Sequence, residues 1–198
     1  MNLPNKLTVM RILLVFVILI ISFLDIPVEV VGISLKYLII DIIFIIASIT
    51  DHYDGYLARK NNQITTFGKF LDPIADKILV ITTMLLLTER GTLPAWIPII
   101  TIFREFLVSG YRLVEAKEGG KVVAANIWGK IKTVTQMIAI ILMVIDSNKF
   151  FAFTTTKLPM PLVILNILGS IMMLISVIAT IFSGYTYLKN GKDLFKDR

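Results

Sequence analysis

Six apolar segments, each close to the length of a membrane-crossing helix, dominate this 198-residue sequence. They cover residues 7–24, 35–60, 67–87, 95–113, 127–145 and 162–188. A helix needs about 20 predominantly apolar residues to cross a bilayer. The segments lack the polar–apolar alternation that a transmembrane β-barrel requires. We therefore expect an all-α integral membrane protein with six transmembrane helices, forming a single domain over residues 1–198.

Composition supports lipid as the solvent. Hydrophobic residues make up 56% of the chain and charged residues 17%, whereas soluble domains carry about 45–50% and about 25%. The net charge is +6. The basic residues lie beside apolar segments, so we interpret them as topology signals and binders of anionic lipid or phosphate, and we expect no nucleic-acid partner. The absence of cysteine excludes disulfides and thiolate metal sites.

The basic residues also predict an orientation. With six spans, both termini lie on one side of the membrane, together with the connections between spans two and three and between spans four and five. All but four of the 20 Lys and Arg residues belong to that side; the exceptions are Lys36, Arg90, Lys149 and Lys157. Because positive charge marks the cytoplasmic side, we expect a multi-pass protein of the cytoplasmic membrane with both termini in the cytoplasm.

Four carboxylates lie in or beside the second and third apolar segments. Asp51 and Asp54 are three residues apart, and Asp72 and Asp76 are four apart, so each pair shares one helix face. With a turn at residues 61–65, Asp54 and Asp72 both lie about 10 Å from the turn. An antiparallel helical hairpin would therefore bring the two pairs to the same depth, face to face.

Four converging carboxylates predict bound cations, because they cannot all stay ionised without counter-charge. Oxygen ligands select a hard ion such as Mg²⁺ or Mn²⁺. Two such ions could clamp a diphosphate in a polar cavity.

Small residues accompany these acids. Gly55 follows Asp54, Ala58 lies one turn later, and Gly68 lies one turn before Asp72. They could leave a channel for a flat group such as a nucleotide base. The alternative is ordinary small-residue helix packing, which we would prefer for a lone glycine but not beside four acids.

The complete pattern resembles the signature of the CDP-alcohol phosphotransferase family. It reads Asp51-x-x-Asp54-Gly55-x-x-Ala58-Arg59, then eight residues, then Gly68-x-x-x-Asp72-x-x-x-Asp76, with no departure from the family's pattern. The six-span layout is also similar, so the resemblance covers nearly the whole chain. It implies a membrane enzyme, usually a homodimer, with its cavity open to the cytoplasm.

The resemblance also implies roles for the motif residues. The four aspartates would hold two divalent cations, Mg²⁺ or Mn²⁺, on the CDP diphosphate, and Asp76 would be the general base for the acceptor hydroxyl. The CDP group would contact the residues between and beside them, namely Asp54, Gly55, Ala58, Arg59 and Gly68.

Basic residues in the fourth and fifth segments indicate the acceptor. Arg104 lies within an apolar run and needs a partner. Glu105 is adjacent and is not expected to face it on a helix, so a phosphate in the cavity is an attractive partner. Arg112, Lys130 and Lys132 could join it. For the two lysines, a role as topology signals alone is an alternative of nearly equal weight.

Segments 104–112 and 129–133, together with Gln136 and residues 2–11, resemble the phosphatidylglycerophosphate synthase branch of the same family. This resemblance implies transfer of the phosphatidyl group from CDP-diacylglycerol to glycerol 3-phosphate. Alternatives are other acceptors (inositol phosphate, serine or phosphatidylglycerol), a divalent-cation transporter, or a structural membrane adaptor. A transporter should carry polar residues through the full membrane depth, and an adaptor would not need four costly acids.

Overall fold

The computed structural model describes residues 3–30, 33–60, 66–117, 127–154 and 159–190; within these ranges it leaves the side chains of residues 3–4, 51–60, 66–70, 72, 113–117 and 190 undescribed. The described chain forms six α-helices, which are α1 (Leu3–Phe23), α2 (Leu35–Lys60), α3 (Thr66–Glu89), α4 (Trp96–Lys117), α5 (Ile127–Ile145) and α6 (Met160–Asn190). This confirms the predicted helical fold. The small elements were not predicted: strands β1 (Glu29–Val30) and β2 (Ile33–Ser34) pair antiparallel, and a 3₁₀ helix, η1, covers Ala152–Thr154.

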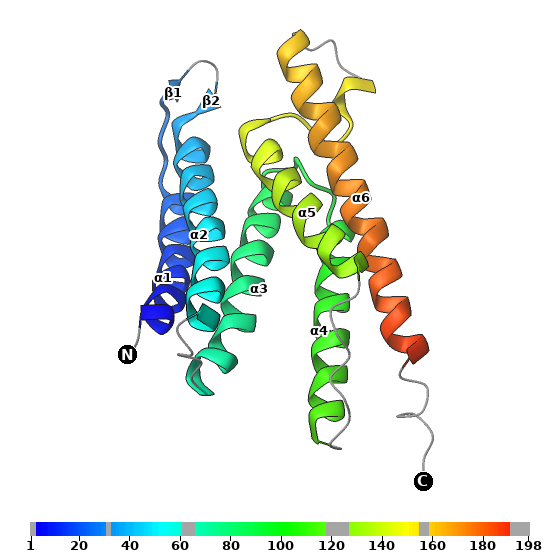
Figure 1. Ribbon diagram of the computed structural model, residues 1–198. Coiled ribbons are helices and arrows are strands. Elements are labelled where there is room, and N and C mark those ends of the chain that lie inside the picture. Colours follow the sequence, from blue (N-terminus) through cyan, green and yellow to red (C-terminus); the bar gives the residue numbers. More distant parts are fainter. Residues whose placement is uncertain (1–2, 31–32, 61–65, 118–126, 155–158, 191–198) are drawn as a thin grey trace.

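The helices alternate in direction along the chain (Figure 1). α1 begins and α6 ends at the lower end of the view, where α2 also ends and α3 begins. The β1–β2 hairpin and η1 lie at the upper end. The α1 helix packs on α2 and α3, the α5 and α6 helices pack on each other, and α4 packs on α6. This up-and-down order is the arrangement that six consecutive spans require.

Three helices are long and apolar enough to cross a membrane. They cover Asn5–Phe23, Ile127–Ile145 and Met160–Lys189 within the described residues. The α2, α3 and α4 helices have 26, 24 and 22 residues, so their lengths also suffice for a span. These three helices carry the predicted acids and arginines.

The distribution of side chains is that of a membrane protein. Large apolar residues point outward at helical spacing, as in Ile99, Phe103 and Phe106 on α4, which are 63%, 69% and 72% exposed. Polar residues are buried instead, including Thr83, Gln136 and Thr180. Lipid favours this arrangement because it solvates apolar side chains, while buried polar groups bond between helices. The chain is therefore a membrane protein.

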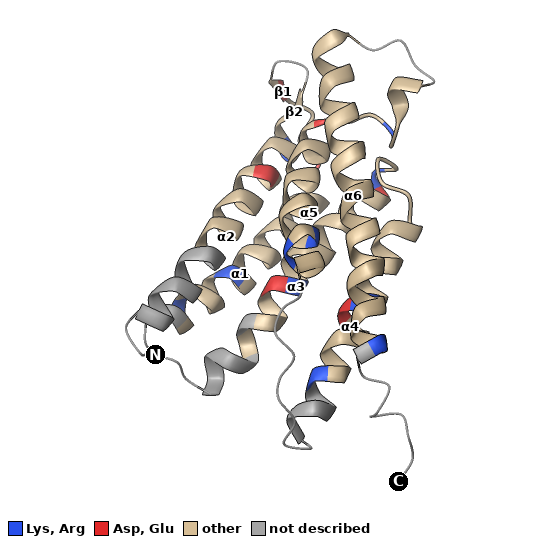
Figure 2. Cartoon of the chain, turned by 45° about the vertical axis from the view of Figure 1, so that its right-hand side comes forward, with Lys and Arg blue, Asp and Glu red and all other residues tan. Residues whose placement is uncertain are grey.

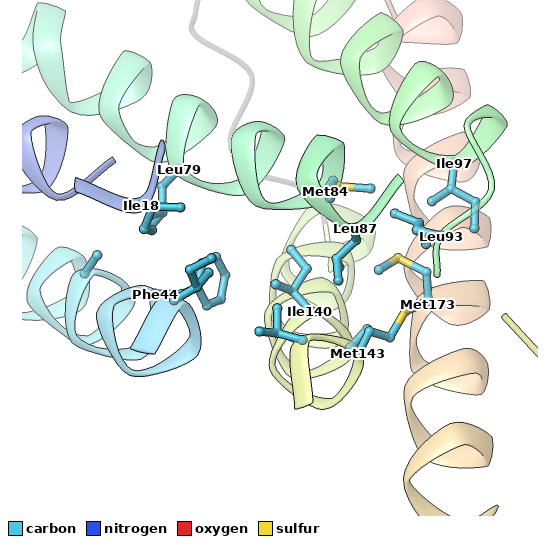
Figure 3. Close-up of a cluster of buried hydrophobic side chains, with 14 of the residues drawn as sticks. Ile18, Phe44, Leu79, Met84, Leu87, Leu93, Ile97, Ile140, Met143 and Met173 are labelled. Carbon is cyan, nitrogen blue, oxygen red and sulfur yellow. The ribbon is translucent and has the colours of Figure 1, made fainter. Parts of the chain in front are cut away.

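A buried apolar cluster joins all six helices. Ile18 of α1, Phe44 of α2 and Leu79 of α3 meet on one side of it (Figure 3). Met84 and Leu87 of α3 continue it toward residues of α4, α5 and α6, among them Ile97, Ile140 and Met173. Because α3 contributes to both halves, it links the α1–α2 pair to the α4–α6 group and fixes the acidic motif relative to α4 and α5.

Candidate active site

The backbone places the predicted acidic motif on two antiparallel helices. Asp51 and Asp54 lie in the last turns of α2, and Asp72 and Asp76 in the first turns of α3. Asp54 is as far from the end of α2 as Asp72 is from the start of α3, which is the equal depth that the sequence predicts. The residues whose side chains lie outside the described set are Asp51, Asp54, Gly55, Ala58, Arg59, Gly68 and Asp72. The predicted turn, 61–65, also lies outside it.

Asp76 is the motif residue whose side chain is described. Its carboxylate is 46% exposed, and its Oδ1 atom lies 2.5 Å from Nη1 of Arg11 on α1, whose side chain is fully buried. Thr8 and Asn5, about one and two turns before Arg11, are also buried. Through Arg11, the α1 helix thus contacts Asp76. A buried guanidinium beside a half-exposed carboxylate holds it in place with a charge-assisted bond.

A cavity of about 710 Å³ opens beside Asp76, between α3, α4 and α5. One part of its wall is apolar and contains Ile74, Val80, Ile81, Val108 and Met137. The other part is polar and contains Asp76, Lys77, Thr101, Arg104, Glu105, Ser109, Arg112, Lys132, Thr133 and Gln136. Figure 2 shows charged residues near the middle of α3, on α4 and at the start of α5, whereas α6 is uncharged over most of its length. The cavity can therefore hold an anionic group and an apolar group together.

The polar wall centres on Glu105. Its Oε1 atom accepts hydrogen bonds from Nζ of Lys132 at 2.5 Å and from Nη1 of Arg104 at 2.9 Å. Its Oε2 atom lies 3.8 Å from Nζ of Lys77, which also donates to the Ser109 hydroxyl. The expectation that Glu105 would not face Arg104 is therefore wrong. Side chains of adjacent residues leave a helix in different directions. The Arg104 side chain is nevertheless long enough to reach the Glu105 carboxylate, which Lys132 also contacts.

The other predicted cations are placed differently. Nη2 of Arg104 donates to the Ser183 hydroxyl at 2.5 Å, and Nη2 of Arg112 donates to the Tyr187 hydroxyl at 2.8 Å. Both partners lie on α6, so α6 supports the two arginines from behind. Lys130 is exposed and is absent from the cavity wall, whereas Lys132 is buried within it. The structure thus shows different environments for two lysines for which the sequence predicts the same role.

Two glycines make room for Arg104. A Cβ atom on Gly129 would lie 3.6 Å from its Nη2 atom, and one on Gly184 would lie 3.6 Å from its Cγ atom. These are ordinary contacts, but a longer side chain at either position would extend toward the arginine. Gly184 thus lies against Arg104 where α6 packs on α4. Gly169 lies closer still to its neighbour, since a Cβ there would be 3.2 Å from Cγ of Met143 across the α5–α6 contact.

The donor chemistry of the acidic motif fits a divalent cation. Carboxylate oxygens are the ligands that Mg²⁺ and Mn²⁺ prefer, and Asp76 offers one at the edge of the cavity with its surface half open. Among the described side chains, no group of three potential ligands gathers. The cation-binding hypothesis therefore depends on Asp51, Asp54 and Asp72 joining Asp76.

Sequence reasoning missed three contributors to this site, namely Lys77, Glu105 and Arg11. A helical stripe could have indicated part of it, because Thr101, Glu105, Ser109 and Arg112 follow the spacing of one α4 face. No local pattern could have indicated that Arg11 pairs with Asp76, because the two residues are 65 positions apart.

Comparison with known proteins gives consistent matches. Residues 1–182 match the family described as CDP-alcohol phosphatidyltransferase. A Bacillus subtilis protein named CDP-diacylglycerol–glycerol-3-phosphate 3-phosphatidyltransferase is 41% identical, covering 98% of this chain and 97% of its own. Proteins of the same name from Rickettsia bellii and Haemophilus influenzae are each 36% identical, covering 98% and 99% of this chain and 97% and 96% of their own.

Proposed function

This chain belongs to the CDP-alcohol phosphatidyltransferase family, and we propose that it transfers the phosphatidyl group of CDP-diacylglycerol to sn-glycerol 3-phosphate. The products are phosphatidylglycerophosphate and CMP. The observation that carries this proposal is one cavity in which Asp76 and a cluster of basic side chains, including the buried Lys132, share a wall with apolar side chains. The names of the full-length relatives support the choice of donor and acceptor.

The acceptor's phosphate would bind the cations of the polar wall. Arg104, Arg112 and Lys132 line the cavity, and arginine's planar fork suits phosphate oxygens. Among the described residues, Nε of Arg104 is buried without a hydrogen-bond partner. Lys130, exposed at the start of α5, would act on the approaching anion from outside the cavity.

Asp76 would take the proton of the acceptor hydroxyl. The hydroxyl oxygen then forms a bond to the β-phosphorus of CDP-diacylglycerol, and the bond from that phosphorus to the oxygen of CMP breaks. CMP leaves with the electron pair of the broken bond. Arg11 would hold the Asp76 carboxylate toward the cavity during this transfer. A positioned carboxylate of this kind typically contributes a factor of about 10²–10⁴.

Two divalent cations would be held by Asp51, Asp54, Asp72 and Asp76. When bound, Mg²⁺ or Mn²⁺ ions would neutralise the diphosphate and the departing CMP. The cytidine would lie along α2 and α3, against Gly55, Ala58 and Gly68, with Asp54 and Arg59 beside the nucleotide. The match to the family supports these assignments.

The chain would work as a single six-span domain in the cytoplasmic membrane. The alternation of helix direction (Figure 1) supports six spans, and the bias of Lys and Arg supports cytoplasmic termini and a cytoplasmic cavity. We also propose a homodimer, as the family resemblance implies.

Acceptor preference tests the proposal. Purified protein in detergent receives CDP-diacylglycerol, Mg²⁺ and one acceptor: glycerol 3-phosphate, inositol 1-phosphate, serine or phosphatidylglycerol. We expect CMP release with glycerol 3-phosphate alone. Release with another acceptor would keep the family and reject the acceptor. If folded protein releases CMP with none, while liposomes containing it take up Mn²⁺, the transporter hypothesis would replace this one.

Arg104→Met should weaken acceptor binding selectively. A hydrogen bond to a charged group contributes about 1.5–3 kcal/mol, so we expect the KM for glycerol 3-phosphate to rise about 10- to 100-fold. The KM for CDP-diacylglycerol should not change. Lys189→Met, an exposed basic position at the end of α6, is the matched control. Equal KM values in the wild type and Arg104→Met would contradict a phosphate-binding role.

Arg11→Met should lower kcat about tenfold or more, because the carboxylate that takes the proton loses its charged partner. Arg11→Lys keeps the charge and should retain more activity. Steady-state kinetics on variants with wild-type size-exclusion profiles measure this. An unchanged kcat in folded Arg11→Met would show that the Arg11–Asp76 contact does not assist the reaction.

A further inference from the structure

One carboxylate connects the three helices that form the cavity. Glu105 of α4 bonds Lys132 of α5 and Arg104 of its own helix, and it lies 3.8 Å from Lys77 of α3. These side chains are largely withdrawn from solvent: Glu105 is 14% exposed, Arg104 13% and Lys132 9%. Of the four ion pairs given by the described residues, Glu105 is the acid in three, and Asp76 is the acid in the fourth.

Buried cations that share a cavity repel one another, and each is costly without a counter-charge. Without the Glu105 carboxylate, Lys132 and Arg104 would separate or take up other partners. A phosphate that must bond both of them would then meet a scattered set of donors, so the carboxylate can prearrange the anion site.

Glu105 leaves most of the donors available. Lysine has three N–H donors and arginine five. Within the described part of the chain, Lys132 donates to Glu105 alone, and Arg104 donates once to Glu105 and once to Ser183. Both bonds to Glu105 end on the same oxygen, Oε1. The carboxylate thus gathers the two cations without using up the donors that an incoming phosphate needs.

We propose that Glu105 is a positioning residue for the acceptor, holding Lys132 and Arg104 side by side so that both bond one phosphate group. This inference rests on the proposed function. It predicts that an acid within a phosphate site strengthens phosphate binding, which is the opposite of what simple charge repulsion predicts.

Glu105→Gln tests whether the carboxylate strengthens or weakens phosphate binding. The amide keeps the shape but loses the charge, so we expect the KM for glycerol 3-phosphate to rise about tenfold or more. The kcat and the KM for CDP-diacylglycerol should change little, since neither depends on the acceptor's phosphate. Glu105→Asp keeps the charge and should recover part of the affinity. Glu89→Gln, an exposed position at the end of α3, is the matched control.

A double variant separates positioning from structure. If Glu105 acts through Lys132, then Glu105→Gln should add little to the KM of a Lys132→Met protein. A structural role would instead lower Tm and kcat, with losses that add in the double variant, and would overturn the proposal. A lower KM in Glu105→Gln would also overturn it, because the carboxylate would then compete with phosphate.

The activity of the wild type distinguishes a failure of the proposed function from a failure of the proposed role of Glu105. If the wild type shows no CMP release that depends on glycerol 3-phosphate, the proposed function fails. If the wild type is active and Glu105→Gln has the same KM for glycerol 3-phosphate as the wild type, the function stands and only the role of Glu105 is rejected.

Discussion

Asp76→Asn should reduce the rate of CMP release by about three orders of magnitude. The amide cannot accept the hydroxyl proton, and it is a poorer ligand for a divalent cation than a carboxylate. Its contact with Arg11 also loses the charge that strengthens it. The measurement is kcat with CDP-diacylglycerol and glycerol 3-phosphate, both at saturating concentrations.

The control for this variant is Asp25→Asn. Asp25 is an exposed acid that follows α1, near the β1–β2 hairpin, and its replacement makes the same chemical change far from the cavity. Its kcat should equal that of the wild type. Asp76→Asn protein that is monodisperse in detergent and retains more than about a tenth of wild-type kcat would exclude Asp76 as the base, because a general base contributes at least about 10².

The helices could be predicted from the sequence because the physical signal is local. A run of about 20 apolar residues has few alternatives to a helix in lipid. The predicted spans 35–60 and 127–145 coincide with α2 and α5. The bounds of α1, α3, α4 and α6 differ by up to four residues at their ends, most at the start of α1 and the end of α4, where charged and polar residues continue the helix beyond the apolar run.

The depth of the acidic motif could also be predicted, because it depends only on helix rise and on the position of one turn. The partners of the charged residues could not. Which cation Glu105 contacts depends on how α3, α4 and α5 pack, and its Oε1 atom accepts from the adjacent Arg104 and from Lys132 on another helix. The interaction partner of Arg11 likewise depends on the packing of α1 against α3.

Metal removal should abolish the reaction completely. Protein dialysed against EDTA should release no CMP, since the diphosphate of CDP-diacylglycerol and the aspartates of α2 and α3 would face one another without counter-charge. Mg²⁺ or Mn²⁺ should restore activity. Ca²⁺ should restore much less, because it prefers 6–8 ligands at about 2.3–2.6 Å rather than the about 2.0–2.1 Å of Mg²⁺.

A binding measurement separates the metal from the chemistry. Titration with Mn²⁺, followed by the loss of its free EPR signal, should give two bound ions per wild-type chain in the presence of CDP-diacylglycerol. Asp72→Asn should bind fewer, whereas Asp25→Asn should bind the same number as the wild type. Full activity in chelated protein with no measurable metal would contradict the two-cation hypothesis. In that case the basic residues that α3, α4 and α5 contribute to the cavity wall would have to neutralise the diphosphate, and Lys77 and Arg112 would become the first residues to replace.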